Sequence, residues 1–234
     1  MINIKGKKAI VLGGTSGIGL SVSRQLRDAG ASVIAVSRSG SIDGDSASIT
    51  VESCDVLDRP GLSALFSKHA PFDFMVCAAT GGARARGPFL EMDLDAFQGS
   101  FAKLWGYTNA VRIGTEHMTE DGAIVLVSGS PARKCSAGML AISTVGNSVE
   151  GFARALAPEI TPRRINVVSP GLIDTPMVPL EGQARVEHYQ NVTAGNLIPR
   201  AGQPDEVAQG VLFVLSNQFV TGTTVDVDGG ALLP

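Results

Sequence analysis

Short apolar runs alternate with amphipathic stretches along most of the 234-residue chain. The runs have the length of β-strands, and the stretches between them repeat apolar residues at helical spacing. Because parallel strands need a crossover connection, usually a helix, this alternation predicts a mostly parallel, doubly wound α/β sheet with helices on both faces. We expect seven strands, at Lys8–Leu12, Ala31–Ser37, Ser48–Cys54, Phe72–Cys77, Ala123–Ser128, Arg164–Val168 and Thr224–Val227.

Five amphipathic stretches have the length and the capping residues of helices. The Gly/Ser/Asp-rich stretch Ser39–Ser46 is too short for a helix between the second and third strands. No linker, repeat or low-complexity segment divides the chain, so we expect one domain over residues 1–234. The expected helices lie at Ile18–Ala29, Pro60–His69, about Leu94–Met118, about Ser143–Ala157 and about Pro204–Leu215.

The longest stretch without clear periodicity is Gly171–Arg200, which contains three prolines. It predicts a loop with a short helix. Loops of this length inside a domain are usually functional lids or disordered. We therefore expect a substrate lid at about residues 174–200.

Composition limits the classes of partner. The chain has 22 acidic and 19 basic residues, whereas nucleic-acid and anionic-membrane surfaces gather Lys and Arg. No apolar run approaches the ~20 residues of a membrane span, and the first residues lack a secretory signal. The three cysteines and three histidines have no metal-ligand spacing. We expect a cytoplasmic protein that binds neither nucleic acid, membrane nor metal, with a small-molecule substrate.

A glycine-rich segment, Gly13–Gly19 (GGTSGIG), lies directly between the first strand and the first helix. Glycines permit a tight turn and a close backbone approach, while a helix N-terminus offers unpaired N–H groups to a pyrophosphate. The context therefore predicts dinucleotide binding, with a purely structural turn as the alternative. The expected contacts are Gly13, Thr15, Ser16, Gly17, Ile18 and Gly19.

The residues at the end of the second strand indicate which nicotinamide cofactor binds. A free ribose 2′-hydroxyl is normally bound there by Asp or Glu, whereas a 2′-phosphate needs a cation. Ser37 and Arg38 therefore favour NADP(H) over NAD(H), unless Arg38 is only a solvated loop residue. After the third strand, Asp55 and Val56 suit the adenine, although an Asp at this point is also a common helix cap.

Three motifs together resemble the short-chain dehydrogenase/reductase family. They are the GGTSGIG loop, the run Asn166–Pro176 and the tail Thr221–Gly230, and the likeness covers essentially the whole chain. The resemblance implies a Rossmann fold, an NAD(P)(H) cofactor, and a homodimer or homotetramer formed through the helices at about 94–118 and 143–157. It also adds contacts beside the cofactor at Ala78, Ala79, Pro170, Gly171, Ile173 and Thr175.

The catalytic residues implied by that resemblance are missing. Family members use a Tyr proton donor, a Lys four residues later, a Ser after the fifth strand and a helix Asn. In this chain the same register places Ile142, Gly146, Gly129 and Lys103 at those positions. The chain has only two tyrosines, and neither is followed by a Lys four residues later. The usual Tyr–Lys pair is therefore absent in any register.

Several other side chains are candidates for the chemistry. Lys103 could stabilise an alkoxide or donate a proton, or be an ordinary helix lysine. Ser128 and Ser130 end the fifth strand at the ligand-binding edge of the sheet. The lid residues His188 and Tyr189 are further possible donors, and Arg133 and Lys134 could attract an anionic substrate or be a solvated pair.

The main hypothesis is an atypical NADP(H)-dependent oxidoreductase that acts on a small carbonyl or alcohol. The alternative is an NADP(H)-binding sensor, scaffold or inactive partner subunit, because a retained phosphate loop with altered catalytic positions suits both. A third possibility is a lyase or isomerase that uses the nucleotide structurally.

Overall fold

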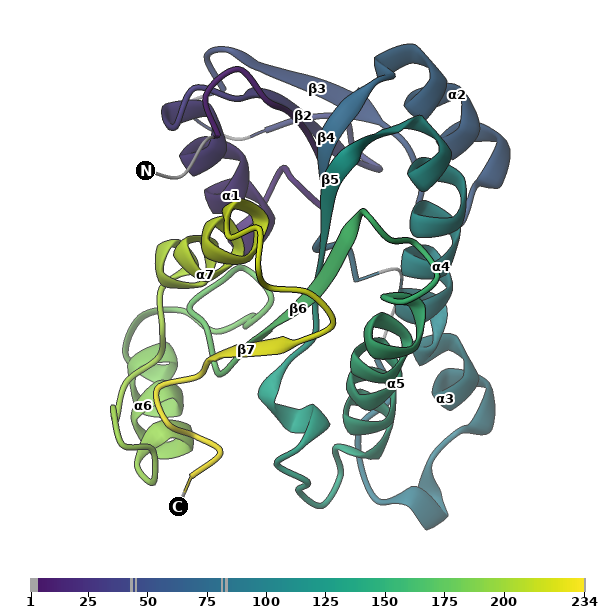
Figure 1. Cartoon of the computed structure of the whole chain (residues 1–234). Helices are drawn as coiled ribbons and strands as arrows, with labels where there is room; N and C mark the ends of the chain where they lie inside the picture. The colour runs from purple at the N-terminus through teal and green to yellow at the C-terminus, as the bar shows by residue number, and fades with distance from the viewer. Residues whose placement is uncertain (1–3, 43, 45, 81, 83, 234) are drawn as a thin grey trace.

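Seven parallel strands form one sheet in the order β3-β2-β1-β4-β5-β6-β7 (Figure 1). The computed structural model describes residues 4–42, 44, 46–80, 82 and 84–233. The Rossmann-like architecture predicted from the sequence is confirmed. The chain order reverses between β1 and β4, which is where doubly wound sheets open a crevice for ligands. The strands are β1 (Lys8–Leu12), β2 (Ser32–Ser37), β3 (Ile49–Ser53), β4 (Phe72–Cys77), β5 (Met118–Val127), β6 (Arg164–Pro170) and β7 (Thr224–Val227).

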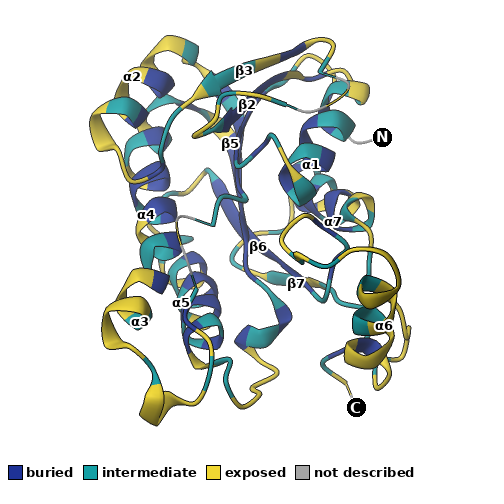
Figure 2. Ribbon diagram, turned by 180° about the vertical axis from the view of Figure 1, so that it is seen from behind, coloured by how far each residue is buried: buried dark blue, intermediate teal, exposed yellow. Residues whose placement is uncertain are grey.

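Helices cover both faces of the sheet, and alternate strand residues face each helix layer. In β1, Ile10 and Leu12 pack with α2 (Arg59–His69), α4 (Ala102–Gly114) and α5 (Leu140–Leu156). Their neighbours Ala9 and Val11 pack with α1 (Gly17–Asp28) and α7 (Pro204–Ser216) on the other face. Figure 2 shows the central strands buried between the two layers, whereas β3 and β7 at the sheet edges are more exposed. A sheet covered on both faces leaves its strand ends as the place for a site.

The predicted helix at about 94–118 is wrong in its middle and at its end. It breaks at Phe101 into α3 (Leu94–Ser100) and α4, with a short 3₁₀ turn after α4 at Thr115–His117. At the break, the Ser100 hydroxyl accepts a hydrogen bond from the Ala85 amide at 2.8 Å and donates one to the Ala96 carbonyl at 2.9 Å. The hydroxyl thus fastens the preceding loop to the end of α3.

Other boundaries differ by a few residues. Strand β5 begins at Met118 rather than Ala123, because Met118 pairs with Phe72 across an irregular register. Helix α5 begins at Leu140, so it includes both Ile142 and Gly146. The predicted loop at 171–200 contains α6 (Gly182–Thr193), a longer helix than the short one expected. Within the described residues of 39–46 there is no helix, as predicted, and 43 and 45 lie outside them.

In the part of the chain that the structure describes, no helix is both long enough and apolar enough to cross a membrane.

Candidate functional site

A cavity of about 1280 Å³ opens at the carboxyl ends of the central strands. The glycine-rich loop, the beginning of α5 and the segment before and within α6 form its walls. The residues predicted to bind the cofactor and the three main catalytic candidates all line this one cavity. They are Gly13, Thr15, Ser16, Gly17, Ile18, Gly19, Ser37, Arg38, Asp55, Val56, Ala78, Ala79, Pro170, Gly171, Ile173 and Thr175 for the cofactor, and Lys103, Ser128 and Ser130 for catalysis.

The glycine-rich loop brings the backbone unusually close to neighbouring segments. Gly13 has φ of +80°, and a Cβ added there would lie 2.6 Å from the Ala79 amide nitrogen. A Cβ on Gly19 would lie 2.0 Å from the Gly13 carbonyl oxygen. Helix α1 starts directly at this loop, with no side chain capping its N-terminus and no acidic residue in its first turn. The first amides of α1 therefore remain for an anion such as a pyrophosphate, and the loop fits a dinucleotide.

At the end of β2, the cavity wall carries a cation. Arg38 is exposed, and its guanidinium makes no hydrogen bond or ion pair with any described residue. The Ser37 hydroxyl lies 3.1 Å from that of Ser39 and accepts from the Gly40 amide at 3.1 Å. Arg38 is thus available for a phosphate, as the sequence argument for NADP(H) requires.

Asp55 lies at the cavity and is not the cap of the next helix. Its carboxylate accepts from the Leu57 amide at 2.9 Å, while Asp58 caps α2 by accepting from Gly61. The helix cap is therefore Asp58, and Asp55 lines the cavity.

Lys103 is a buried amine at the inner end of the cavity. Its side chain extends from α4, the residue is 8% exposed, and Nζ donates to the Ser128 carbonyl oxygen at 3.3 Å. Nζ also lies 5.6 Å from the centre of the Tyr107 ring. Burial, with a smaller contribution from the positive charge of Arg84, lowers the pKa of Lys103 to about 7. An amine of that pKa holds and releases protons at neutral pH, which suits general acid–base catalysis.

The two serines differ in what their hydroxyls contact. Ser128 Oγ donates to the Gly146 carbonyl at 3.2 Å and lies 3.4 Å from a carboxylate oxygen of the buried Glu150. Ser130 also lines the cavity, and its hydroxyl has no hydrogen-bond partner among the described residues. Ser130 is therefore the serine that is free to bind a substrate oxygen.

Ile142 and Gly146 both face the cavity from α5, where the resemblance implies the Tyr and Lys. Gly146 packs tightly against the 3₁₀ turn Ser130–Ala132. A Cβ at residue 146 would lie 2.9 Å from the Ala132 Cβ and 3.4 Å from Ser128 Oγ. Any side chain at this position would therefore require the Ser130–Ala132 turn to shift.

The lid residues proposed as donors separate in the structure. His188 lines the cavity, whereas Tyr189 is absent from its described lining. The Tyr189 hydroxyl donates to Asp174 at 2.9 Å, and its ring lies 5.2 Å from the Arg185 guanidinium. These contacts hold Tyr189 within the lid segment itself.

Arg133 and Lys134 separate in the same way. Arg133 pairs with Asp226 and with Glu150, and it does not line the cavity. Lys134 does line it, although its Nζ donates to the Ala231 carbonyl oxygen at 2.6 Å. Of the two residues that were expected to attract an anionic substrate, Lys134 lines the cavity and Arg133 does not.

The sequence argument missed Arg84 and Arg86, which also line the cavity. Both lie in the loop that follows β4, and they could have been found from the rule that such loops border the ligand crevice. Three apolar residues of the segment 174–200 line the cavity and were also not predicted individually: Met177, Leu180 and Val192.

Comparison with known proteins agrees with this geometry. A family model described as Enoyl-(Acyl carrier protein) reductase matches residues 13–231. The chain is 31% identical over 242 residues to carbonyl reductase family member 4 of Danio rerio, covering 96% of this chain and 98% of that protein. It is 32% identical over 235 residues to the cyclic-di-GMP-binding biofilm dispersal mediator protein of Escherichia coli (strain K12), covering 96% of each.

A crystal structure of a small-chain dehydrogenase in complex with NADPH has a TM-score of 0.87 against this chain at 28% identity. The similarity covers 98% of this chain and 100% of that one. The matched region contains the glycine-rich loop, the cavity and the lid segment. The chain therefore belongs to the short-chain dehydrogenase/reductase family of oxidoreductases.

Proposed function

We propose that the protein is an NADP(H)-dependent oxidoreductase for a small carbonyl or alcohol, with Lys103 as its proton donor and acceptor. The observation that carries the proposal is the buried Lys103 amine, whose pKa of about 7 places it between its two protonation states at neutral pH. When bound, the nicotinamide supplies a hydride to a carbonyl carbon or accepts one from an alcohol. The Lys103 ammonium gives its proton to the carbonyl oxygen, so that the carbonyl becomes a hydroxyl group.

Ser130 and the lid complete the proposed site. The Ser130 hydroxyl, which lacks a partner among the described residues, donates a hydrogen bond to the same substrate oxygen. Residues 174–200 act as the lid, because Met177, Leu180 and Val192 border the cavity from this segment. Their apolar side chains exclude water from the reacting atoms.

A second candidate function is nucleotide binding without redox turnover, as a sensor, scaffold or inactive partner subunit. It is supported by Ile142 and Gly146 at the positions of the expected Tyr and Lys. The Escherichia coli relative is named for binding cyclic-di-GMP rather than for a reaction. Turnover assays distinguish the two candidates: oxidation of NADPH that depends on Lys103 excludes the second.

The preference for NADP(H) is tested at Arg38. We expect the protein to bind NADPH more tightly than NADH, and Arg38→Ala to lower NADPH affinity about tenfold while leaving NADH affinity unchanged, because a phosphate–guanidinium contact contributes ~1.5–3 kcal/mol. Isothermal titration with each cofactor measures this. Arg112→Ala, an exposed arginine on α4 outside the described cavity lining, is the matched control. Equal affinities in the unmodified protein would contradict the role of Arg38.

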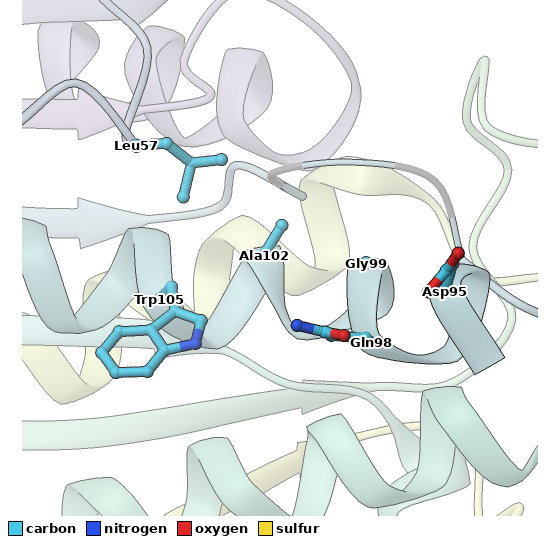
Figure 3. A pocket seen from close by; sticks show the side chains of 6 residues that line it. All are labelled: Leu57, Asp95, Gln98, Gly99, Ala102 and Trp105. Atoms are coloured by element: carbon cyan, nitrogen blue, oxygen red, sulfur yellow. The ribbon is translucent and has the colours of Figure 1, made fainter.

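We also propose a homo-oligomer that uses the outer face of α3 and α4. A second pocket, of about 430 Å³, lies on this face (Figure 3). Its wall includes Trp105, which is 55% exposed, and Leu57, which is 42% exposed. Exposed large apolar residues around a hollow are typical of protein interaction sites.

Trp105→Glu should therefore shift the protein to the monomer at micromolar concentration. Light scattering after size-exclusion chromatography measures the mass. Val186→Glu, on the exposed side of α6, should leave the mass unchanged. A monomeric unmodified protein would contradict the proposed interface.

A further inference from the structure

The cavity wall carries more positive than negative charge. Arg84, Arg86, Lys103 and Lys134 line the cavity together with Arg38, whereas Asp55 is the only acidic residue among its described lining residues. Asp55 follows β3, the edge strand of the sheet, and β2, β1 and β4 lie between that strand and β5. Glu150, the nearest buried carboxylate, lies behind Ser128 and is paired with Arg133.

Arg84 is the most unusual of these cations. It is half-buried, yet its guanidinium makes no hydrogen bond or ion pair with any described residue. Burial lowers the pKa of Arg84, and its charge in turn lowers the pKa of Lys103. Neighbouring cations repel each other, and a half-buried arginine without an acidic partner carries part of a desolvation cost that nothing compensates. An anionic ligand would remove both penalties.

The cofactor phosphates have other partners. The pyrophosphate fits the N-terminus of α1 and a 2′-phosphate fits Arg38, both at the β1–β2 side of the cavity. Arg84 is on the β4–α3 loop, close enough to Lys103 to perturb its titration. The anion that Arg84 suits is therefore part of the substrate.

Apolar side chains also line the cavity. Met139 and Ile142 contribute from α5 and the turn before it, and Met177, Leu180 and Val192 contribute from the lid segment. The cavity thus combines a cationic end beside the proposed proton donor with an apolar cover.

We propose that the substrate is a carboxylate-bearing carbonyl or alcohol, a small oxo acid or hydroxy acid with an apolar body, whose carboxylate binds Arg84. A guanidinium matches a carboxylate through two parallel hydrogen bonds, which also orients the carbonyl. The assignment of a carbonyl or alcohol as the reacting group rests on the proposed function, whereas the binding of an anion at Arg84 does not.

Binding without turnover tests the anion site separately. Hexanoate and hexanamide share an apolar chain and differ in charge, and neither is a carbonyl substrate for hydride transfer. In isothermal titration of the NADP⁺-saturated protein, hexanoate should bind at least tenfold more tightly than hexanamide. Arg84→Gln should weaken hexanoate binding at least tenfold and leave hexanamide binding unchanged, while Arg84→Lys should retain part of the preference. Arg112→Gln is the control for a change in net charge.

Two results would overturn the proposal. One is equal binding of hexanoate and hexanamide by the unmodified protein. The other is a loss of NADP⁺ affinity in Arg84→Gln as large as the loss of hexanoate affinity, which would assign Arg84 to the cofactor. If Arg84→Gln does not fold, as judged by circular dichroism, the Arg84→Lys titration decides: an unchanged preference for hexanoate overturns the proposal.

Turnover is then measured with 2-oxohexanoate and 2-hexanone. If hexanoate binding depends on Arg84 but 2-oxohexanoate is not reduced, the anion site is supported and the oxidoreductase proposal is contradicted. Faster reduction of 2-oxohexanoate than of 2-hexanone, lost in Arg84→Gln, supports both.

Discussion

Lys103→Met should lower the rate of carbonyl reduction about 10²–10⁴-fold, the usual contribution of a positioned general acid, while NADPH binding stays within about twofold. Methionine keeps the unbranched shape of the lysine stem but has no titratable group. The amine at the inner end of the cavity is the only group removed. Steady-state assays with a panel of carbonyl compounds and titration of NADPH give the two readouts.

The pH profile gives an independent check on Lys103. Reduction requires the ammonium form, so its rate should fall above about pH 7, whereas alcohol oxidation requires the neutral amine and should rise through the same pH. These opposite profiles should both disappear in Lys103→Met. A reduction rate that survives in the variant with an unchanged profile would assign the proton to another group.

The same substitution should stabilise the folded protein. The folded-state pKa of Lys103 is lowered from 10.5 to about 7, so between these values the unfolded chain binds the proton more tightly. The free energy of unfolding of the unmodified protein therefore rises as the pH increases from about 7 to 10.5. Below pH 7 the full destabilisation from burying the charged Lys103 is present. Lys103→Met should be the more stable protein at neutral pH and should lack this part of the rise. Chemical denaturation at several pH values measures the difference.

Gly146→Ala should destabilise the protein by about 1–3 kcal/mol, because the new Cβ would overlap the Ala132 side chain. For a chain of this size each kcal/mol corresponds to about 2–4 °C of Tm. The pair Ile142→Tyr with Gly146→Lys should be less stable still and should gain no carbonyl reduction, although it restores the Tyr–Lys spacing of the family. Thermal unfolding and NADPH oxidation are the measurements.

A double-mutant cycle identifies the contact responsible. Ala132→Gly removes the Cβ that lies 2.9 Å from the added atom, so the cost of Gly146→Ala should be smaller in the Ala132→Gly background. Gly151→Ala, on the same helix with open space around it, should not lower Tm and serves as the matched control. A Tm of Gly146→Ala equal to that of the unmodified protein would show that the turn moves aside easily.

The sequence predicted the sheet, and the residues that it assigned to the cofactor lie around one cavity, because both depend on local patterns. Alternating strands and helices fix which strand ends meet, and Gly13 and Gly19 mark a turn that no larger residue can enter. The break at Phe101 was not predicted. At the break, Ser100 accepts a hydrogen bond from Ala85, fifteen residues earlier in the chain, and no local pattern indicates that contact.

The catalytic end was predicted only in part. Lys103 was found by its place in a register, but its depressed pKa comes from burial and from Arg84, which no local pattern relates to it. Ser128 and Ser130 could not be told apart from sequence, because their difference lies in contacts with α5.

The hydrogen bond between Ala85 and Ser100 fastens the chain beside Arg84 to the end of α3. Ala85 adjoins Arg84 in the sequence, and Ser100 lies three residues before Lys103. The two cations therefore come from segments that are tied to each other through this bond. We expect that a change in the length of the loop between β4 and α3 would alter the spacing of the two charges, and with it which substrates fit, without touching either charged residue.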